Sequence, residues 1–144
     1  MNKRLNIALS IAALVVALSV PLSAQSFQLT AKIPFDFAVG AKSMPAGEYQ
    51  VTRDSSPSLL LLRGSEHGGG AIILANPGFV RAGGDPAADT VLVFRHYGDR
   101  YFLSEVRNGF AGIAYMVPMS KAEREMSKTA SAQRYEVLAT LARR

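Results

Sequence analysis

The stretch TVLVFRHYGDRYFLSEV, residues 90 to 106, decides the fold of this chain. Two runs rich in β-branched and aromatic residues flank Gly98-Asp99, which is the pattern of a β-hairpin. Glycine can take the positive φ that the first central position of a type II′ turn requires, and this turn matches the twist of the flanking strands. The stretch therefore predicts an antiparallel hairpin with Gly98 and Asp99 as its loop.

A two-residue loop also predicts the register of the hairpin. Tyr97 should face Arg100. Counting residue by residue away from the turn places Val91 opposite Val106, unless a bulge at Arg100 shifts the pairing. The predicted faces carry Leu92, Phe94, His96, Tyr101, Leu103 and Glu105 on one side and Val91, Val93, Arg95, Tyr97, Arg100, Phe102, Ser104 and Val106 on the other. Both faces are apolar toward the open end and polar toward the turn. We therefore expect the open end to lie inside a sandwich or barrel and the turn to protrude.

Short apolar runs separated by turn signals occupy most of the chain outside the hairpin. The predicted strands are residues 27–39, 48–53, 59–62, 71–75, 79–81 and 113–117. Pro34 has no donor for a ladder hydrogen bond and should mark an edge or a bulge between two short strands. The four leucines Leu59–Leu62 favour a strand buried on both faces. Asn76-Pro77-Gly78 should end the strand of residues 71–75.

The hydrophobic period changes after Pro118. Ser120 followed by Glu123 predicts a capping box, with the hydroxyl bonded to the amide of Glu123 and the carboxylate bonded back to the amide of Ser120. A short exposed helix should follow. Residues 135 to 141 alternate in polarity and favour a last strand, although a continued helix fits almost as well. The whole pattern predicts an all-β protein, a small antiparallel β-sandwich or partly open barrel with one short C-terminal helix.

Residues 1 to 24 have the pattern of a signal peptide. A basic start precedes an uncharged apolar run from Leu5 to Val20, Pro21 interrupts it, and Leu22-Ser23-Ala24 ends in a small residue that suits signal peptidase. The run is shorter than the roughly 20 apolar residues that span a bilayer comfortably, so a cleaved peptide is favoured over an uncleaved anchor. We expect a secreted or periplasmic protein with a single domain, residues 25–144, and no stable membrane span after cleavage.

Composition limits the classes of partner. The 144-residue chain carries 16 basic and 11 acidic residues, and after loss of the leader about 120 residues remain, enough for one core. It has no cysteine, so neither a disulfide nor a thiol-attached lipid anchors it. The basic residues are scattered, and export also argues against nucleic acid as a partner. Solvated surface charge with a mild attraction to anionic envelope surfaces is the favoured interpretation.

The two histidines are the natural place to look for chemistry. His67 lies beside Glu66 in a glycine-rich loop, and His96 lies near the turn of the hairpin with Asp99 close by. No local spacing joins both histidines to a carboxylate, as a metal site would require. The chain also contains no Gly-x-Ser-x-Gly elbow and no phosphate-binding loop. The sequence therefore predicts no metal, no cofactor and no catalytic residue.

The tip of the hairpin is the candidate binding site. Tyr97, Arg100, Tyr101 and Phe102 are of the types enriched at binding surfaces, and they lie at a turn that should protrude. A structural role, in which the aromatic residues pair across the strands and Arg100 covers them, is favoured over recognition.

Three stretches resemble a group of small, exported, uncharacterised proteins of Acidobacteria-type soil bacteria. They are IPFDFAVGAKSMPAGEYQV at 33–51, VFRHYGDRYFLSEV at 93–106 and SKAEREMSK at 120–128, and they occur in the order typical of the group. Residues 107–119 depart from it, because a more polar segment usually precedes the helix. The resemblance implies a secreted or periplasmic β-rich domain, and it carries over no catalytic residue.

Three functions remain open from the sequence. The first is an exported, non-enzymatic β-module that binds an unknown envelope or extracellular component. The second is an extracellular enzyme that uses His67 or His96, and the third is a barrel that holds a small apolar ligand. A pocket on the order of 300 Å³ or larger with converging polar groups would favour the second or third.

Overall fold

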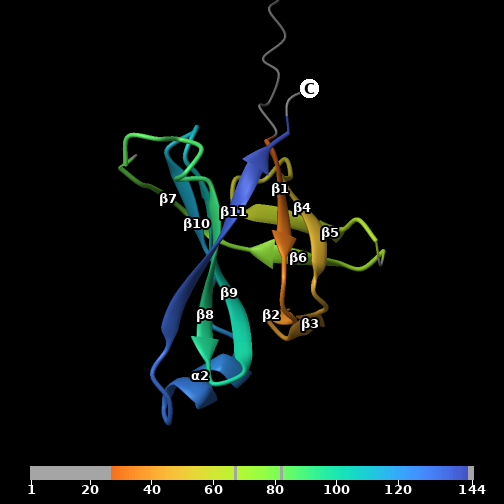
Figure 1. Ribbon diagram of the computed structural model, residues 1–144, viewed down its shortest axis with the longest axis vertical. Coiled ribbons are helices and arrows are strands. Elements are labelled where there is room, and N and C mark those ends of the chain that lie inside the picture. The colour runs from red at the N-terminus through yellow and green to blue at the C-terminus, as the bar shows by residue number, and fades with distance from the viewer. Residues whose placement is uncertain (1–26, 67, 82, 143–144) are drawn as a thin grey trace, which may run out of the picture.

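The strands form one strongly bent sheet that curls into a nearly closed barrel (Figure 1). The structure is a computed structural model and describes residues 27–66, 68–81 and 83–142. The predicted all-β class with one short C-terminal helix is confirmed. The predicted signal peptide and its cleavage site lie outside the described residues, as does His67. In the part of the chain that is described, no helix is long and apolar enough to cross a membrane.

The elements follow one another in the chain as β1 (Gln28–Ile33), β2 (Phe37–Val39), β3 (Lys42–Met44), β4 (Gly47–Arg53), β5 (Leu59–Gly64), β6 (Gly70–Leu74), β7 (Asn76–Phe79), β8 (Val91–Tyr97), β9 (Arg100–Asn108), β10 (Ile113–Met116), α2 (Lys121–Ser127) and β11 (Gln133–Leu141). The order in the sheet is β3-β2-β9-β8-β11-β1-β4-β5-β6, and β10 pairs with both β9 and β7. β2 and β9 run parallel, and the other pairs are antiparallel.

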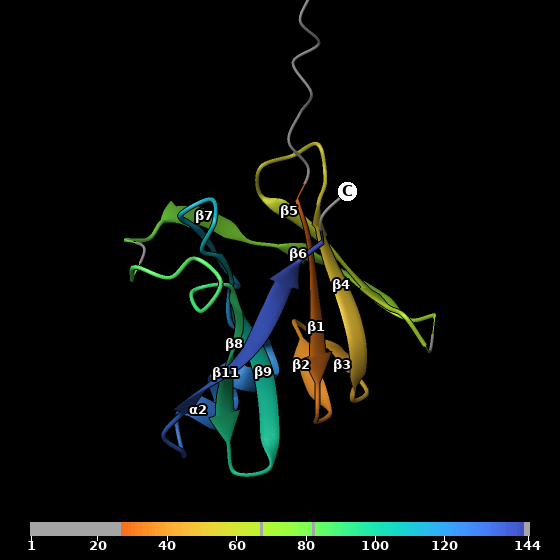
Figure 2. The ribbon, with the colours of Figure 1, turned by 45° about the horizontal axis from the view of Figure 1, so that its top comes forward.

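Two segments change partners and thereby close the barrel. β11 pairs with β8 through residues 133–138 and with β1 through residues 139–141, so it crosses from one half of the sheet to the other (Figure 2). β6 pairs with β5, and one residue later the chain continues as β7, which pairs with β10. The ring of pairings therefore runs from β9 through β8, β11, β1, β4, β5, β6–β7 and β10 back to β9.

The strand before Asn76-Pro77-Gly78 ends as predicted, since β6 stops at Leu74, but the segment itself is a new strand, which the sequence did not predict. It forms most of β7, whose only partner among the described strands is β10. An edge strand tolerates a proline whose nitrogen faces away from the partner. By contrast, Pro34 separates β1 from β2 as predicted. The strand prediction for residues 135 to 141 is also confirmed, and the alternative of a continued helix is wrong.

The turn of the central hairpin forms as predicted. Gly98 has a φ of +63°, and no described residue other than glycine has a positive φ, so Asp99 fits the second position of a type II′ turn. Tyr97 pairs with Arg100, which excludes a bulge at Arg100. The next predicted pairs, Arg95–Phe102, His96–Tyr101 and Phe94–Leu103, are also present.

A β-bulge shifts the register toward the open end of the hairpin, so the predicted pairing of Val91 with Val106 is wrong. Val91 instead lies opposite Arg107, and Ser104 is the extra residue of the bulge. The Ser104 hydroxyl donates to a backbone carbonyl of the facing strand at 3.0 Å. Because of the bulge, Val106 turns into the core. Glu105 lies on the opposite face, where it is buried and pairs with Arg107 at 2.7 Å.

The leucine run is buried on one face only, which corrects the expectation of two buried faces. Leu60 and Leu62 are fully buried in the core, whereas Leu59 and Leu61 are half-buried. Their outward neighbours on β6, Ile72 and Leu74, are largely exposed. No layer of the described structure therefore covers this part of the outer sheet.

The β2–β3 hairpin lies at one end of the barrel, the lower end in Figure 1. Its residues Phe37 and Met44 are buried in the core. Beside them, the Tyr49 hydroxyl donates to the carbonyl of Pro45 at 2.7 Å. Burial raises the pKa of Tyr49, and the negative charge of Asp36 adds to the effect.

Helix α2 packs on the outer face of the hairpin. Ser120 caps it as predicted, and its hydroxyl accepts from the amide of Glu123 at 3.1 Å. The other half of the predicted capping box is wrong, because the Glu123 carboxylate binds the guanidinium of Arg95 on β8. On the exposed side of the helix, Glu125 pairs with Lys128 at 2.8 Å.

Candidate functional site

The aromatic residues at the hairpin tip do not form one surface. Tyr97 and Phe102 are each only 2% exposed, and they contact each other edge to face with ring centroids 5.9 Å apart. Together with Ala38 they form a small outer cluster that Met126 of α2 partly covers. The exposed Arg100 lies with its guanidinium carbon 5.2 Å from the Phe102 ring centroid. These three tip residues therefore have the geometry of the structural role considered from the sequence.

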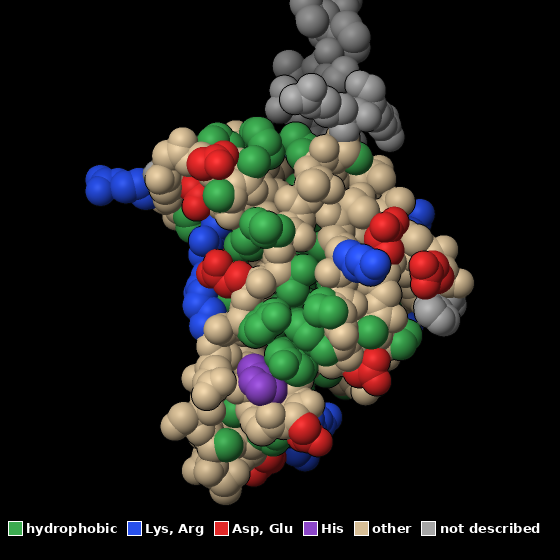
Figure 3. Space-filling view, in the orientation of Figure 1, with side chains coloured by type: hydrophobic (Ala, Val, Ile, Leu, Met, Phe, Trp, Pro, Cys, Tyr) green, Lys and Arg blue, Asp and Glu red, His purple; other side chains and the backbone are tan. Residues whose placement is uncertain are grey.

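Tyr101 faces the other side of the hairpin. Its ring stacks on His96 at a centroid distance of 4.0 Å and on Phe35 at 3.7 Å, and Tyr135 meets it edge to face. We call Phe35, His96, Tyr101 and Tyr135 the aromatic seam, because Phe35 follows β1 while the others come from β8, β9 and β11. Figure 3 shows hydrophobic side chains gathered on this face of the molecule, with a histidine beside them.

The side chain of His96 makes one specific contact within the described part of the chain, with a stacked aromatic ring. Among the described residues, His96 makes no hydrogen bond or ion pair, and its partner is the stacked ring of Tyr101. No group of three or more metal-ligating side chains is found within residues 27–66, 68–81 and 83–142. The described structure therefore offers no acid–base pair or metal cluster at this histidine.

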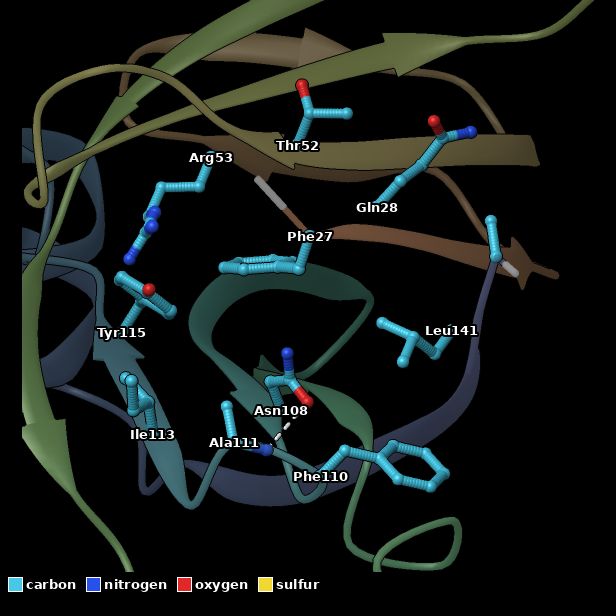
Figure 4. A pocket seen from close by; sticks show the side chains of 11 residues that line it. Phe27, Gln28, Thr52, Arg53, Asn108, Phe110, Ala111, Ile113, Tyr115 and Leu141 are labelled. Carbon is cyan, nitrogen blue, oxygen red and sulfur yellow. Dashed lines mark hydrogen bonds between the residues drawn. The ribbon is translucent and has the colours of Figure 1, made fainter. Parts of the chain in front are cut away.

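A pocket of about 680 Å³ opens at the end of the barrel where β1 begins and β11 ends (Figure 4). We call it the mouth pocket. Its lining residues are Phe27, Gln28, Thr52, Arg53, Asn108, Phe110, Ala111, Ile113, Tyr115, Leu141 and Ala142. They come from the beginning of β1, the end of β4, the β9–β10 connection, β10 and the end of β11.

Strand pairing and a turn position the walls of the mouth pocket. Gln28 lies opposite Thr52 in the β1–β4 ladder, which brings the adjacent Phe27 and Arg53 to the same end of the barrel. The Phe27 ring lies 5.5 Å from that of Tyr115 on β10. On the facing side, the carboxamide oxygen of the buried Asn108 accepts from the backbone of the following turn at 3.2 Å.

Polar and apolar side chains are interspersed around the mouth pocket (Figure 4). Figure 4 shows Arg53 pointing toward Tyr115 on one side, Leu141 and Phe110 on the other, and Phe27 between them. Among the described lining residues, Arg53 is the one basic side chain, and no aspartate or glutamate is present.

A second hollow of about 660 Å³ adjoins the mouth pocket on the outer surface. It is lined by Asp85, Ala87, Ala88 and residues 138–141 of β11, and the two hollows share Phe110 and Leu141. Phe110 is 55% exposed and forms a ridge between them. We call this second hollow the outer hollow.

No sequence pattern indicates the mouth pocket as a whole. Its residues are separated in the chain by up to about a hundred positions, and each lies in an ordinary strand or turn pattern. One available signal was Phe110, an apolar residue directly after the turn signal Asn108-Gly109.

Comparison of the chain with protein-family models, with curated proteins and with solved structures finds no match. The resemblance to small exported proteins of soil bacteria therefore stays a prediction.

Proposed function

We propose that this chain is an exported, non-enzymatic binding protein whose ligand occupies the mouth pocket. The observation that carries the proposal is the pocket itself, about 680 Å³ at the open end of an otherwise packed barrel. Small-molecule sites are typically clefts of about 300–1,000 Å³ with mostly apolar walls and a few polar groups. The mouth pocket fits this description, because three aromatic rings line it alongside Gln28, Thr52, Arg53 and Asn108.

The lining supports binding of a small molecule more than docking of a large envelope component. Phe27 and Ile113 are only half-buried and Phe110 is exposed, so these side chains keep apolar surface that a ligand can cover. The hairpin tip offers less surface of this kind, since Tyr97 and Phe102 are already buried under α2. The proposal therefore joins the binding-module hypothesis to the ligand-barrel hypothesis.

A neutral fluorescent probe tests whether the mouth pocket binds ligands. N-phenyl-1-naphthylamine, titrated into the purified protein, should show a saturable rise in fluorescence. Ala111→Trp places a large ring in the mouth pocket at an exposed position and should weaken binding by about tenfold, or roughly 1.4 kcal/mol.

Ala87→Trp is the matched control, because it makes the same change at an exposed residue that lines only the outer hollow. It should leave probe affinity unchanged. If Ala87→Trp weakens binding and Ala111→Trp does not, the site is the outer hollow and the proposal is wrong. A wild-type protein that does not bind the probe would also contradict it.

A further inference from the structure

We infer that the mouth pocket selects apolar ring compounds that carry a carbonyl group, and that Asn108 is the residue that recognises the carbonyl oxygen. The inference rests on the proposed function and names the ligand class of the same pocket. It is carried by a buried carboxamide whose NH₂ group has no partner among the described residues.

The carboxamide of Asn108 is held in one orientation. Asn108 is the last residue of β9 and is only 2% exposed. The backbone amide of Ala111 donates to the side-chain oxygen of Asn108 at 3.2 Å and to its backbone carbonyl at the same distance. Exchanging the carboxamide oxygen and nitrogen would set two donors against each other. The oxygen therefore faces the turn, and the nitrogen faces away from it.

The turn that follows Asn108 is attached to a second segment of the chain. The amide of Gly109 donates to the hydroxyl of the fully buried Thr90 at 3.0 Å, and this hydroxyl donates to the carbonyl of Pro86 at 2.7 Å. A Cβ atom at Gly109 would clash with that same carbonyl, so the two segments are in close contact. Asn108 is thus preorganised, and a ligand need not order it on binding.

The carboxamide nitrogen of Asn108 points into the mouth pocket. Figure 4 shows it turned toward the ring of Phe27 and away from Ala111. Within the part of the chain that the structure describes, this NH₂ group donates to no other residue. A ligand that displaces water from the nitrogen and offers no acceptor leaves a buried donor unpaired, which weakens its binding. The pocket therefore discriminates in favour of ligands with an acceptor at this point.

Apolar ring surface lies beside this donor. Phe27 is half-buried, and its ring lies across the middle of the pocket, 5.5 Å from the ring of Tyr115 (Figure 4). The exposed Phe110 adds a further ring to the lining. Aromatic rings pack favourably in offset-stacked or edge-to-face arrangements. A ligand ring packed on Phe27 with a carbonyl at its edge can therefore cover apolar surface and satisfy the Asn108 donor at once.

Two ligands that differ in one carbonyl group, 1-tetralone and its hydrocarbon analogue tetralin, test the inference. Both are measured by displacement of N-phenyl-1-naphthylamine from the wild type and from Asn108→Asp. The variant keeps an oxygen for the amide of Ala111, but an ionised carboxylate has no N–H to donate. The ratio of tetralone affinity to tetralin affinity should fall about tenfold, as expected for the loss of one hydrogen bond. This ratio cancels the different hydrophobicity of the two ligands. An unchanged ratio would overturn the inference and leave the proposed function intact.

Asn76→Asp makes the same change at an exposed residue of β7 outside the pocket lining, and it should keep the wild-type ratio. Should Asn108→Asp fail to fold, nuclear magnetic resonance of the wild type provides the readout. Binding of 1-tetralone should shift the side-chain NH₂ signals of Asn108 downfield, as a new hydrogen bond does, and binding of tetralin should not. Equal shifts with both ligands, or binding of the probe without binding of 1-tetralone, would overturn the inference. Failure of both ligands and of the probe would instead reject the proposed function.

Discussion

Glu123 is the residue at which local and tertiary interactions compete. Its amide completes the N-cap with Ser120, but its side chain, only 2% exposed, turns away from the cap toward Arg95. A bidentate pair with a guanidinium is stronger than one hydrogen bond to an amide, so the tertiary contact prevails. The sequence predicts the cap from local spacing alone. It contains no local signal for a partner 28 residues away.

We predict that Glu123→Gln lowers the free energy of unfolding by roughly 2–3 kcal/mol, because it leaves the partly buried Arg95 guanidinium without its anion. Urea denaturation followed by circular dichroism measures this change.

Glu125→Gln, in the same helix, is the control. The Glu125–Lys128 pair is exposed, so its loss should cost no more than about 0.5 kcal/mol. Equal effects of the two substitutions would mean that the Arg95–Glu123 pair does not stabilise the fold.

At the scale of elements, the central hairpin shows which parts of a strand pair the sequence determines. The turn at Gly98 follows from backbone sterics, and the pairs next to it follow from the turn. The bulge at Ser104 does not follow from the turn, although the position of Glu105 in the sequence is one signal for it. A regular register would have placed Glu105 on the same face as Leu92 and Phe94, among core residues. The bulge moves the carboxylate, which stays buried, out of the apolar core to the face where Arg107 and Arg134 pair with it.

We predict that Gly98→Val destabilises the hairpin by on the order of 1 kcal/mol or more. A Cβ atom at Gly98 would meet no atom within 4 Å, so the cost arises from the positive φ and not from a clash. Thermal unfolding measures it, with Asp99→Val as the control in the same turn, where φ is already negative. An unchanged melting temperature for Gly98→Val would contradict the assigned strain.

At the scale of the whole molecule, the sequence predicts the class of fold and misses its closure. Alternating apolar runs indicate strands wherever they occur, but the partner changes of β11 and of β6–β7 depend on contacts between distant segments. The mouth pocket is a product of that closure, since it lies where the ends of β1, β4 and β11 meet the β9–β10 connection. Residue patterns within any one of these segments do not show which other segments it meets.

The same geometry constrains the proposed export of the protein. Phe27 lines the mouth pocket, and Gln28 begins β1, where it pairs with Thr52. A signal peptidase that cut after Phe27 or later would remove a wall of the pocket, and a cut after Gln28 would also remove part of the first strand. Cleavage after Ala24, the position predicted from Leu22-Ser23-Ala24, preserves both.

We therefore predict that the protein recovered from the periplasm or the medium lacks residues 1–24 and begins at Gln25. Intact-mass spectrometry measures this directly. Ala24→Pro is the matched variant, because a proline at the small-residue position before the cut should block processing and retain the leader. Full-length wild-type protein in the membrane fraction would contradict the prediction. A mature chain beginning after Phe27 that still binds N-phenyl-1-naphthylamine with unchanged affinity would contradict the role of Phe27 in the mouth pocket.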